Sequence, residues 1–195
     1  MKPQPPIPTK CFLDVDELLA AWVQGALRLH ELPDPYIEAS SWGNYNIVDL
    51  VGWSDRAAEF FEPMTEEFWA ELEPTPFAED VVGAVIDAFG PDHVCLLTKP
   101  VLTAGCETGK RRWIERHFPR FRRQYLIGPP KAMCAGPDAL LVDDSDRNVD
   151  EFIARGGQAV VFPRLWNRNY ALAVDPVGYL RDKLAVLTKP RSGGS

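Results

Sequence analysis

Two carboxylates separated by one residue follow the first apolar run of the chain. Residues 10–16 read as a strand that carries Asp14 and Asp16 at its end, and apolar residues from Leu18 to Leu27 then recur at helical spacing. Open α/β sheets bind ligands at the carboxyl edge of their strands, and the free N–H groups of a following helix favour an anion there. We interpret this turn as a magnesium-dependent site for a phosphate. The alternative is that both acids are ordinary turn residues that cap a helix.

The elements needed to position these acids alternate regularly along the chain. The apolar runs predict strands over 10–16, 93–98, 124–127, 139–142 and 159–162. Helical patterns are expected over 17–30, 80–89, 108–117, 149–155 and 177–187. Thr108 and Ser145 are the expected caps at helix starts, and Gly90 is the expected helix end. This alternation predicts an α/β fold with a parallel sheet and right-handed crossovers.

The segment 31–76 has a different character. It lacks a strand-like apolar run but is rich in aromatic residues, and it can form short helices over 54–61 and 65–72 with Ser54 and Thr65 as N-caps. Residues 73–76 then break the chain with two prolines. We therefore predict a core domain made of residues 1–30 and 77–195, with 31–76 inserted as a small helical cap.

Composition excludes several classes of function. The net charge of -7 disfavours an extended nucleic-acid surface, and no apolar run reaches the ~20 residues that span a bilayer. The four cysteines show no C-x-x-C spacing and the three histidines are scattered, so a zinc site is not expected. The N-terminus lacks the apolar core of a signal peptide, so we expect a cytoplasmic protein without a membrane partner. Residues 191–195 are expected to be disordered.

Chemically useful side chains stand at the ends of four predicted elements. Because the carboxyl ends of parallel strands lie along one edge, these side chains should meet. They are Asp14 with Asp16, Thr98, Lys131, and Asp143 with Asp144. Together they supply a nucleophile, an acid/base, a neutral donor, a fixed cation and metal ligands, which are the groups that phosphoryl transfer requires.

The order D-x-D, Thr, Lys, Asp-Asp resembles that of the haloacid dehalogenase-like phosphatases over nearly the whole chain. Two further segments, 68–76 and 110–118, resemble the cap return and the helix after the second motif of the 5'-deoxyribonucleotidase branch, in its cytosolic and mitochondrial pyrimidine type. The resemblance implies a Rossmann-like parallel sheet with helices on both faces, plus a small helical cap that closes over the substrate.

The resemblance also implies roles for individual residues. Asp14 would be the nucleophile that takes the phosphoryl group, and Asp16 would protonate the leaving oxygen and then activate water. Thr98 and Lys131 would bind the phosphoryl oxygens.

A magnesium ion is implied by the same resemblance. Its ligands would be the Asp14 carboxylate, the Asp16 backbone carbonyl, and a carboxylate from either Asp143 or Asp144.

Three positions depart from the pattern of that branch. Glu17 stands where the family usually has glycine, and we expect its side chain to point to solvent, although a contact with the substrate is an alternative. The basic residue after Thr98 comes early, as Lys99, and the residues before Lys131 are Gly-Pro-Pro without the usual arginine. The groups that hold the substrate beyond its phosphate are therefore less well defined, and our candidates are Lys99, Trp42 and Tyr45.

The leading hypothesis is a magnesium-dependent phosphomonoesterase for a nucleoside monophosphate. One alternative keeps the enzyme but changes the substrate to a non-nucleotide metabolite or a phosphorylated nucleic-acid end. Another is a weakly catalytic protein that binds a phosphorylated ligand. The sequence leaves the oligomeric state open, a homodimer included.

Overall fold

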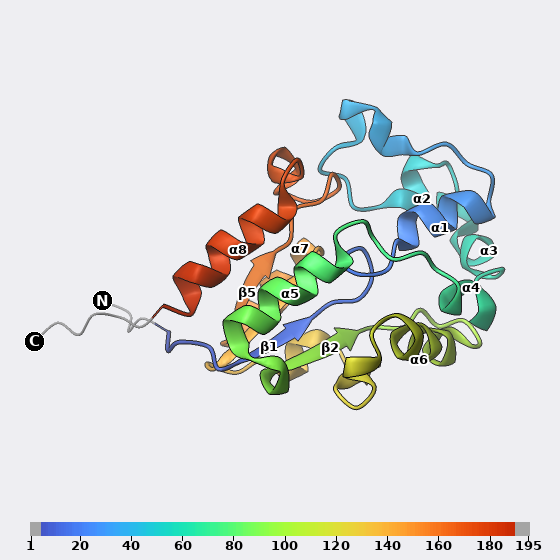
Figure 1. The fold of residues 1–195 in the computed structure, drawn as a ribbon. Helices are drawn as coiled ribbons and strands as arrows, with labels where there is room; N and C mark the ends of the chain where they lie inside the picture. Colours follow the sequence, from blue (N-terminus) through green and yellow to red (C-terminus); the bar gives the residue numbers. More distant parts are fainter. Residues whose placement is uncertain (1–4, 190–195) are drawn as a thin grey trace, which may run out of the picture.

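The computed structural model describes residues 5–189, so the expected disorder of residues 191–195 falls outside the described part of the chain. Figure 1 shows a layered α/β arrangement with the sheet in its centre. Five parallel strands form that sheet in the order β3-β2-β1-β4-β5. They are β1 (Lys10–Leu13), β2 (Val94–Thr98), β3 (Tyr125–Ile127), β4 (Ala139–Asp143) and β5 (Gln158–Val161).

Eight α-helices surround and extend the sheet. They are α1 (Trp22–Leu29), α2 (Ile47–Leu50), α3 (Ala57–Phe61), α4 (Glu66–Ala70), α5 (Ala78–Phe89), α6 (Cys106–His117), α7 (Asp146–Ala154) and α8 (Pro176–Leu187) among the residues described. Short 3₁₀ turns join them, of which η1 (Pro35–Ile37), η2 (Ala39–Ser41), η3 (Ser54–Arg56), η6 (Lys131–Cys134) and η7 (Tyr170–Leu172) matter below.

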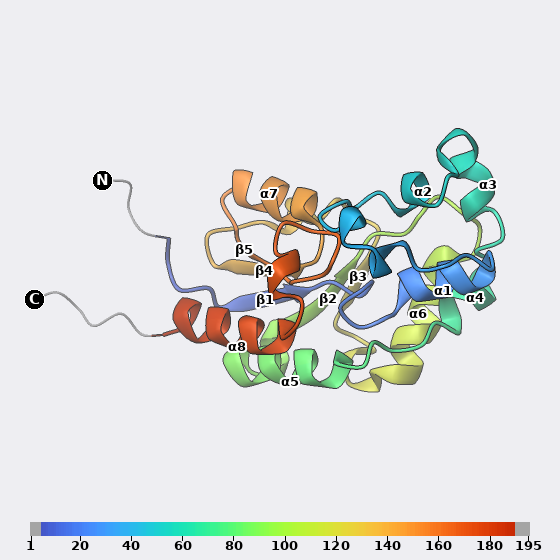
Figure 2. The same cartoon turned by 90° about the horizontal axis from the view of Figure 1, so that it is seen from above.

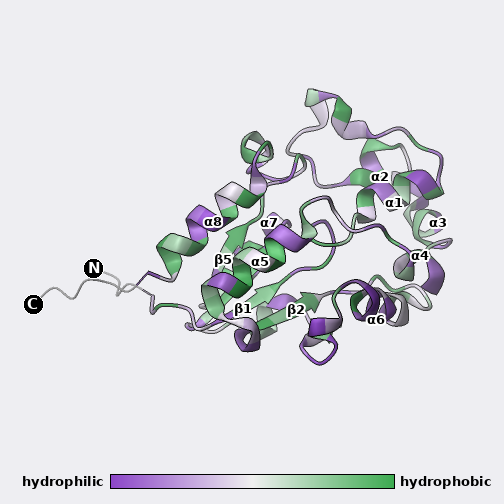
Figure 3. Cartoon of the chain, in the orientation of Figure 1, coloured by the Kyte–Doolittle hydropathy of each residue, from purple (hydrophilic) through white to green (hydrophobic). Residues whose placement is uncertain are grey.

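Helices cover both faces of the sheet. Figure 2 places α5 and α8 together on one side and α7 on the other. Alternate strand residues divide accordingly, because Leu96 and Leu140 belong to the larger core while Leu97 and Leu141 pack with Phe152 of α7. Figure 3 shows the central strands mainly in the colour of hydrophobic residues, whereas α6 is largely hydrophilic. The predicted α/β class with a parallel sheet and two covered faces is confirmed.

The boundaries after the first strand differ from the prediction. β1 ends at Leu13, and α1 begins only at Trp22, so the segment between them is neither the end of a strand nor the start of a helix. Its backbone closes on itself through hydrogen bonds from the amides of Leu19 and Ala20 to the Val15 carbonyl. The apolar residues here are buried in a loop, which is why their spacing imitated a helix. The N-terminus of α1 is therefore not the neighbour of Asp14 that the sequence suggested.

Of the three helix caps expected in the core domain, two are present and one is wrong. Ser145 accepts a hydrogen bond from the Asn148 amide at the start of α7, and Gly90 ends α5 with a φ of 81°. Thr108 lies inside α6, which starts two residues earlier because Gly105 takes the left-handed conformation at its N-cap. A side chain at Gly105 would meet the backbone of Glu66, since α4 and α6 pack closely there.

The segment 31–76 contains η1, η2, α2, η3, α3 and α4, and no strand within it is described. Ser54 and Thr65 do not cap helices with their side chains, and Ser54 instead donates to Asp49. Figure 1 shows the segment, in blue to teal, beside the end of the sheet. Its role as a cap stays a prediction. No helix of the described residues is long and apolar enough to cross a membrane.

Candidate active site

The strand order brings the predicted residues to one edge of the sheet. β1 lies between β2 and β4, so Asp14 directly follows the central strand, with Thr98 ending one neighbour and Asp143 ending the other. The Asp14 amide still donates to the Val142 carbonyl at 3.0 Å, which continues the strand pairing by one residue. Lys131 begins η6 beyond β3. These four positions come together as the sequence predicted.

Lys131 joins two of the carboxylates. Its buried Nζ lies 2.6 Å from Asp14 Oδ1 and 2.7 Å from Asp143 Oδ2. Burial alone would lower the pKa of Lys131, but the two carboxylates outweigh it and raise that pKa. The lysine is therefore a fixed positive charge beside the Asp14 carboxylate.

The adjacent acids Asp143 and Asp144 have different surroundings. Both carboxylate oxygens of Asp143 accept hydrogen bonds. Oδ1 accepts from the Ser145 amide at 2.8 Å and Oδ2 accepts from Lys131. Asn148 Nδ2 lies 3.2 Å from both oxygens. Asp144 accepts one bond at Oδ2, from Trp166 Nε1 at 2.6 Å, and its other oxygen has no donor among the described residues. Asp144 is therefore the acid of this pair with an oxygen left for a cation.

The buried carboxylates form a cluster suited to a metal ion. Asp14, Asp143 and Asp144 each offer an oxygen, and these atoms lie within 4.8 Å of one another. Burial raises the pKa of Asp14 to about 7, with Lys131 opposing the shift and Asp143 adding to it. Burial, followed by repulsion from Asp143 and Asp14, also raises the pKa of Asp144. Because the cluster holds three buried acids and Lys131 pairs with only two of them, it has an excess of negative charge that a divalent cation would relieve.

A second lysine, which the sequence did not single out, holds Asp16. Lys110 of α6 is only 2% exposed, and its Nζ lies 2.6 Å and 2.5 Å from the two carboxylate oxygens of Asp16. The same Nζ donates to Thr98 Oγ1 at 3.1 Å and lies 4.6 Å from the centre of the Trp69 ring. Lys110 thus bridges Thr98, at the end of β2, and Asp16 of the D-x-D turn.

The sequence carried a signal for this lysine. Trp113 and Ile114, three and four residues further along, lie on the buried face of α6. Helical spacing places Lys110 on that same face. A lysine on a buried face needs an acidic partner, and the search for one would have led to the site.

Glu17 is buried, contrary to the prediction that it points to solvent. It is 3% exposed, and its backbone adopts a φ of 65°, in the left-handed region that favours glycine. Its Oε1 accepts from the Val23 amide at the start of α1, and its Oε2 lies 3.1 Å from Arg164 Nη2. Glu17 therefore takes the place of a helix cap and anchors the turn that carries Asp16.

The three candidates for substrate contacts lie in different places. Lys99 is exposed, with no ion pair recorded in the described part of the chain. Trp42 donates from Nε1 to the Tyr36 carbonyl at 2.9 Å, and its ring lies 6.2 Å from that of Tyr170. It lines a cavity to which none of the site carboxylates contributes.

Tyr45 is the candidate that reaches the carboxylates. The residue is 56% exposed, yet its hydroxyl is close enough to Ser145 and Asp144 to interact with both. The Asp144 charge and then burial raise the pKa of Tyr45. The ring is thus at the surface while its polar end lies among the acids.

Comparisons with known proteins add little. Neither protein-family models nor curated proteins match the chain. Among solved structures, "Putative beta-phosphoglucomutase from Bacteroides vulgatus" is similar over 94% of this chain and 92% of that one, with 13% identity and a TM-score of 0.47. A likeness of this size does not bear on what this chain does, so function has to be argued from the geometry of the site.

Proposed function

We propose that this chain is a magnesium-dependent phosphomonoesterase that works through a phosphorylated Asp14 and acts on nucleoside monophosphates. The observation that carries the proposal is the setting of Asp14. One carboxylate oxygen is held by Lys131 and by the Val15 amide, and the other has no donor among the described residues. An oriented carboxylate beside a fixed cation fits nucleophilic attack on an anionic phosphorus.

The chemical steps use this chain's own residues. The free Asp14 oxygen forms a bond to phosphorus while the bond from phosphorus to the leaving oxygen breaks, and Asp16 gives that oxygen its proton. Water then attacks the phosphorylated Asp14 and loses a proton to Asp16, which releases inorganic phosphate and restores both acids. Lys131 would supply positive charge at the phosphoryl group, and Thr98 would donate its hydroxyl to a phosphoryl oxygen.

Magnesium fits the donor set of the site. The Asp14 carboxylate, the Asp16 carbonyl and the free oxygen of Asp144 would hold it, since these hard oxygen ligands suit that cation. When bound, the ion would neutralise charge on the phosphate. Asp143 is assigned to positioning, because its oxygens already accept from Lys131 and from the start of α7.

The choice of a nucleoside monophosphate is supported by the inserted segment. The hydroxyl of its Tyr45 lies near Ser145 and Asp144. Its Phe61 stacks on Trp22 of α1 with an angle of 10° between the ring planes. Aromatic side chains with few cations suit a planar base better than a polyanionic sugar bisphosphate.

The test is a phosphate-release screen over nucleoside monophosphates and sugar phosphates, with and without magnesium. We expect magnesium-dependent release, with the highest kcat/KM on a nucleotide. Release from sugar phosphates alone would remove the nucleotide assignment, and no release from any ester would remove the phosphatase.

A further inference from the structure

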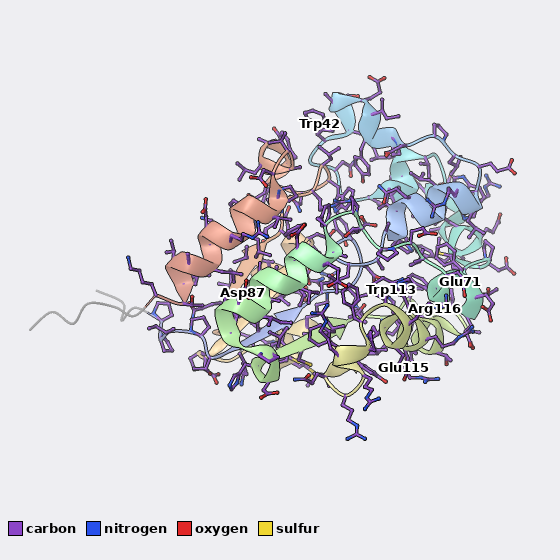
Figure 4. All side chains as sticks on the ribbon, in the orientation of Figure 1. Trp42, Glu71, Asp87, Trp113, Glu115 and Arg116 are labelled. Carbon is purple, nitrogen blue, oxygen red and sulfur yellow. The ribbon has the colours of Figure 1, made fainter. Side chains whose placement is uncertain are left out.

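A cavity of about 390 Å³ lies beside the site, between the inserted segment and the chain after β5. Tyr36 and Trp42 contribute to it from η1 and the end of η2, and Trp166 and Tyr170 contribute from the other side. Figure 4 shows Trp42 on the side of the inserted segment that faces the residues before α8. The volume is within the range of small-molecule sites.

The walls of this cavity are aromatic and held in place. Trp42 is fixed by its bond to the Tyr36 carbonyl, and the Tyr36 hydroxyl donates to the Asn44 carbonyl at 2.9 Å. Trp42 and Tyr170 are 41% and 42% exposed, so part of each ring is free to contact a ligand. Fixed rings with free faces favour a flat partner.

Polar groups with unused capacity share the lining. Arg164 engages Glu17 through Nη2, while its Nε is buried without an acceptor in the described part of the chain. Asp34 uses Oδ1 to accept from the Tyr36 amide, and within residues 5–189 its other oxygen accepts from no donor. The Gln24 side chain, which offers both a donor and an acceptor, also lines the cavity. Donors and acceptors therefore stand together beside the rings.

The cavity is separate from the Asp14 site. None of the four site aspartates lines it, and the buried Trp166 stands between, with its Nε1 on Asp144 and its ring 5.2 Å from that of Tyr36. The Arg164 guanidinium covers the same indole at 4.5 Å.

We propose that this cavity is a second binding site, for a flat heteroaromatic ring of the nucleobase type, independent of the phosphate at Asp14. The ring would contact Trp42 and Tyr170, and its edge would present an acceptor to Arg164 and a donor to Asp34. A purely hydrocarbon ring would leave these polar groups without partners, which disfavours its binding.

The test is calorimetric titration of the full chain with guanosine, which has the ring and the polar edge but no phosphate. We expect saturable binding that Trp42→Ala and Tyr170→Ala each weaken at least tenfold. Ile37→Ala is the matched control, because it removes an exposed apolar side chain of the same segment that neither lines the cavity nor belongs to the Asp14 site, and it should change the affinity less than twofold. Saturating inorganic phosphate with magnesium should not displace guanosine.

Three results would overturn the proposal. If guanosine does not bind saturably, the cavity is not a binding site for this ring. If phosphate displaces guanosine and Tyr45→Ala weakens its binding, guanosine binds at the Asp14 site and the cavity is not a separate site. If benzyl alcohol, which lacks the polar edge of a nucleobase, binds with the same affinity as guanosine, the polar groups of the cavity have no role in recognition. Because no ester is hydrolysed in these measurements, their outcome does not depend on whether the chain is a phosphatase.

Discussion

Glu17 and Arg164 form a largely buried ion pair, 3.1 Å apart, immediately behind the D-x-D turn. Arg164 lies between the rings of Phe77 and Trp166, and Trp166 in turn donates to Asp144. The turn that carries Asp16 is thereby connected to Asp144 through an ion pair, a stacked guanidinium and one hydrogen bond. The residue that departs from the glycine of the resembling family is thus part of the support of the site.

The Glu17 carboxyl predicts a specific pH dependence of stability. Burial raises its pKa from 4.5 to about 7, against the opposing charge of Arg164. Between these values the folded state retains a proton that the unfolded state has lost, so this contribution to stability is complete below pH 4.5 and is lost as pH rises to about 7. The slope for a full proton is about 1.4 kcal/mol per pH unit.

Thermal unfolding of the wild type and of Glu17→Gln from pH 4.5 to 8 measures this. The amide has a similar shape but does not titrate. The unfolding free energy of the wild type should therefore fall relative to that of Glu17→Gln as pH rises. A difference that stays constant over this range would show that Glu17 titrates normally.

Replacement of the nucleophile tests the proposed chemistry. Asp14→Asn should reduce phosphate release at least about 10³-fold, because an amide is a poor nucleophile and a poor metal ligand. Asp16→Asn should cost about 10²- to 10⁴-fold and should allow the phosphorylated protein to accumulate. Intact-protein mass spectrometry after mixing with substrate detects the added phosphoryl group. Near-normal release by Asp14→Asn would contradict the mechanism.

Lys110 is expected to act through Asp16. Lys110→Met leaves that carboxylate without its cation and removes the donor to Thr98 Oγ1. Because Asp16 protonates the leaving oxygen, the loss of kcat should be about tenfold or more greater for an alkyl phosphate than for p-nitrophenyl phosphate, whose leaving group needs little help from an acid. Lys183→Met, an exposed lysine on α8, is the control and should change neither rate. Equal losses on both esters would mean that Lys110 has only a structural role.

The strands and their common edge could be predicted from the sequence because apolar runs of four or five residues mark buried parallel strands. The polar residues that end those runs then meet by topology alone, as Asp14, Thr98 and Asp143 do. The boundary between β1 and α1 could not be predicted, because Leu18 and Leu19 are buried in a loop and have the same spacing as residues on a helix. Burial without regular structure leaves no distinct pattern.

Contacts between distant segments were the other part that the sequence did not reveal. Lys110 meets Asp16 across 94 residues, and Arg164 meets Glu17 across 147. The positive φ of Glu17 is likewise set by its partners, since its type alone gives no reason for it. Side-chain pairing of this kind depends on the completed fold.

Asp143 and Asp144 should respond differently to substitution. Asp144→Asn should raise the magnesium concentration for half-maximal activity at least about tenfold, because it alters the acid with a free oxygen. Asp143→Asn should mainly lower the melting temperature, since it weakens the buried partner of Lys131 and the start of α7. Magnesium titrations of activity and of Tm separate these effects. Retention of full activity in chelator would contradict a metal role for the cluster.

Tyr45 is the residue on which substrate choice is expected to depend. Its hydroxyl lies at Ser145, close enough to Asp144 for that charge to raise its pKa, and its ring extends to the surface. A nucleotide whose phosphate occupies the Asp14 site should contact this ring, whereas a small aryl phosphate should not extend beyond the acids. Tyr45→Ala should therefore lower kcat/KM for a nucleoside monophosphate by about 3- to 10-fold, the size of one aromatic contact, and change that for p-nitrophenyl phosphate by less than twofold.

Tyr45→Phe separates the ring from its hydroxyl. It retains the stacking surface and removes the hydroxyl near Ser145, so it should keep most of the preference for the nucleotide. If Tyr45→Ala lowered kcat/KM equally for both esters, the tyrosine would be supporting the carboxylates and not selecting the substrate. If neither variant changed either rate, the base would have to bind elsewhere in the segment, with the stacked pair Trp22 and Phe61 next to be replaced.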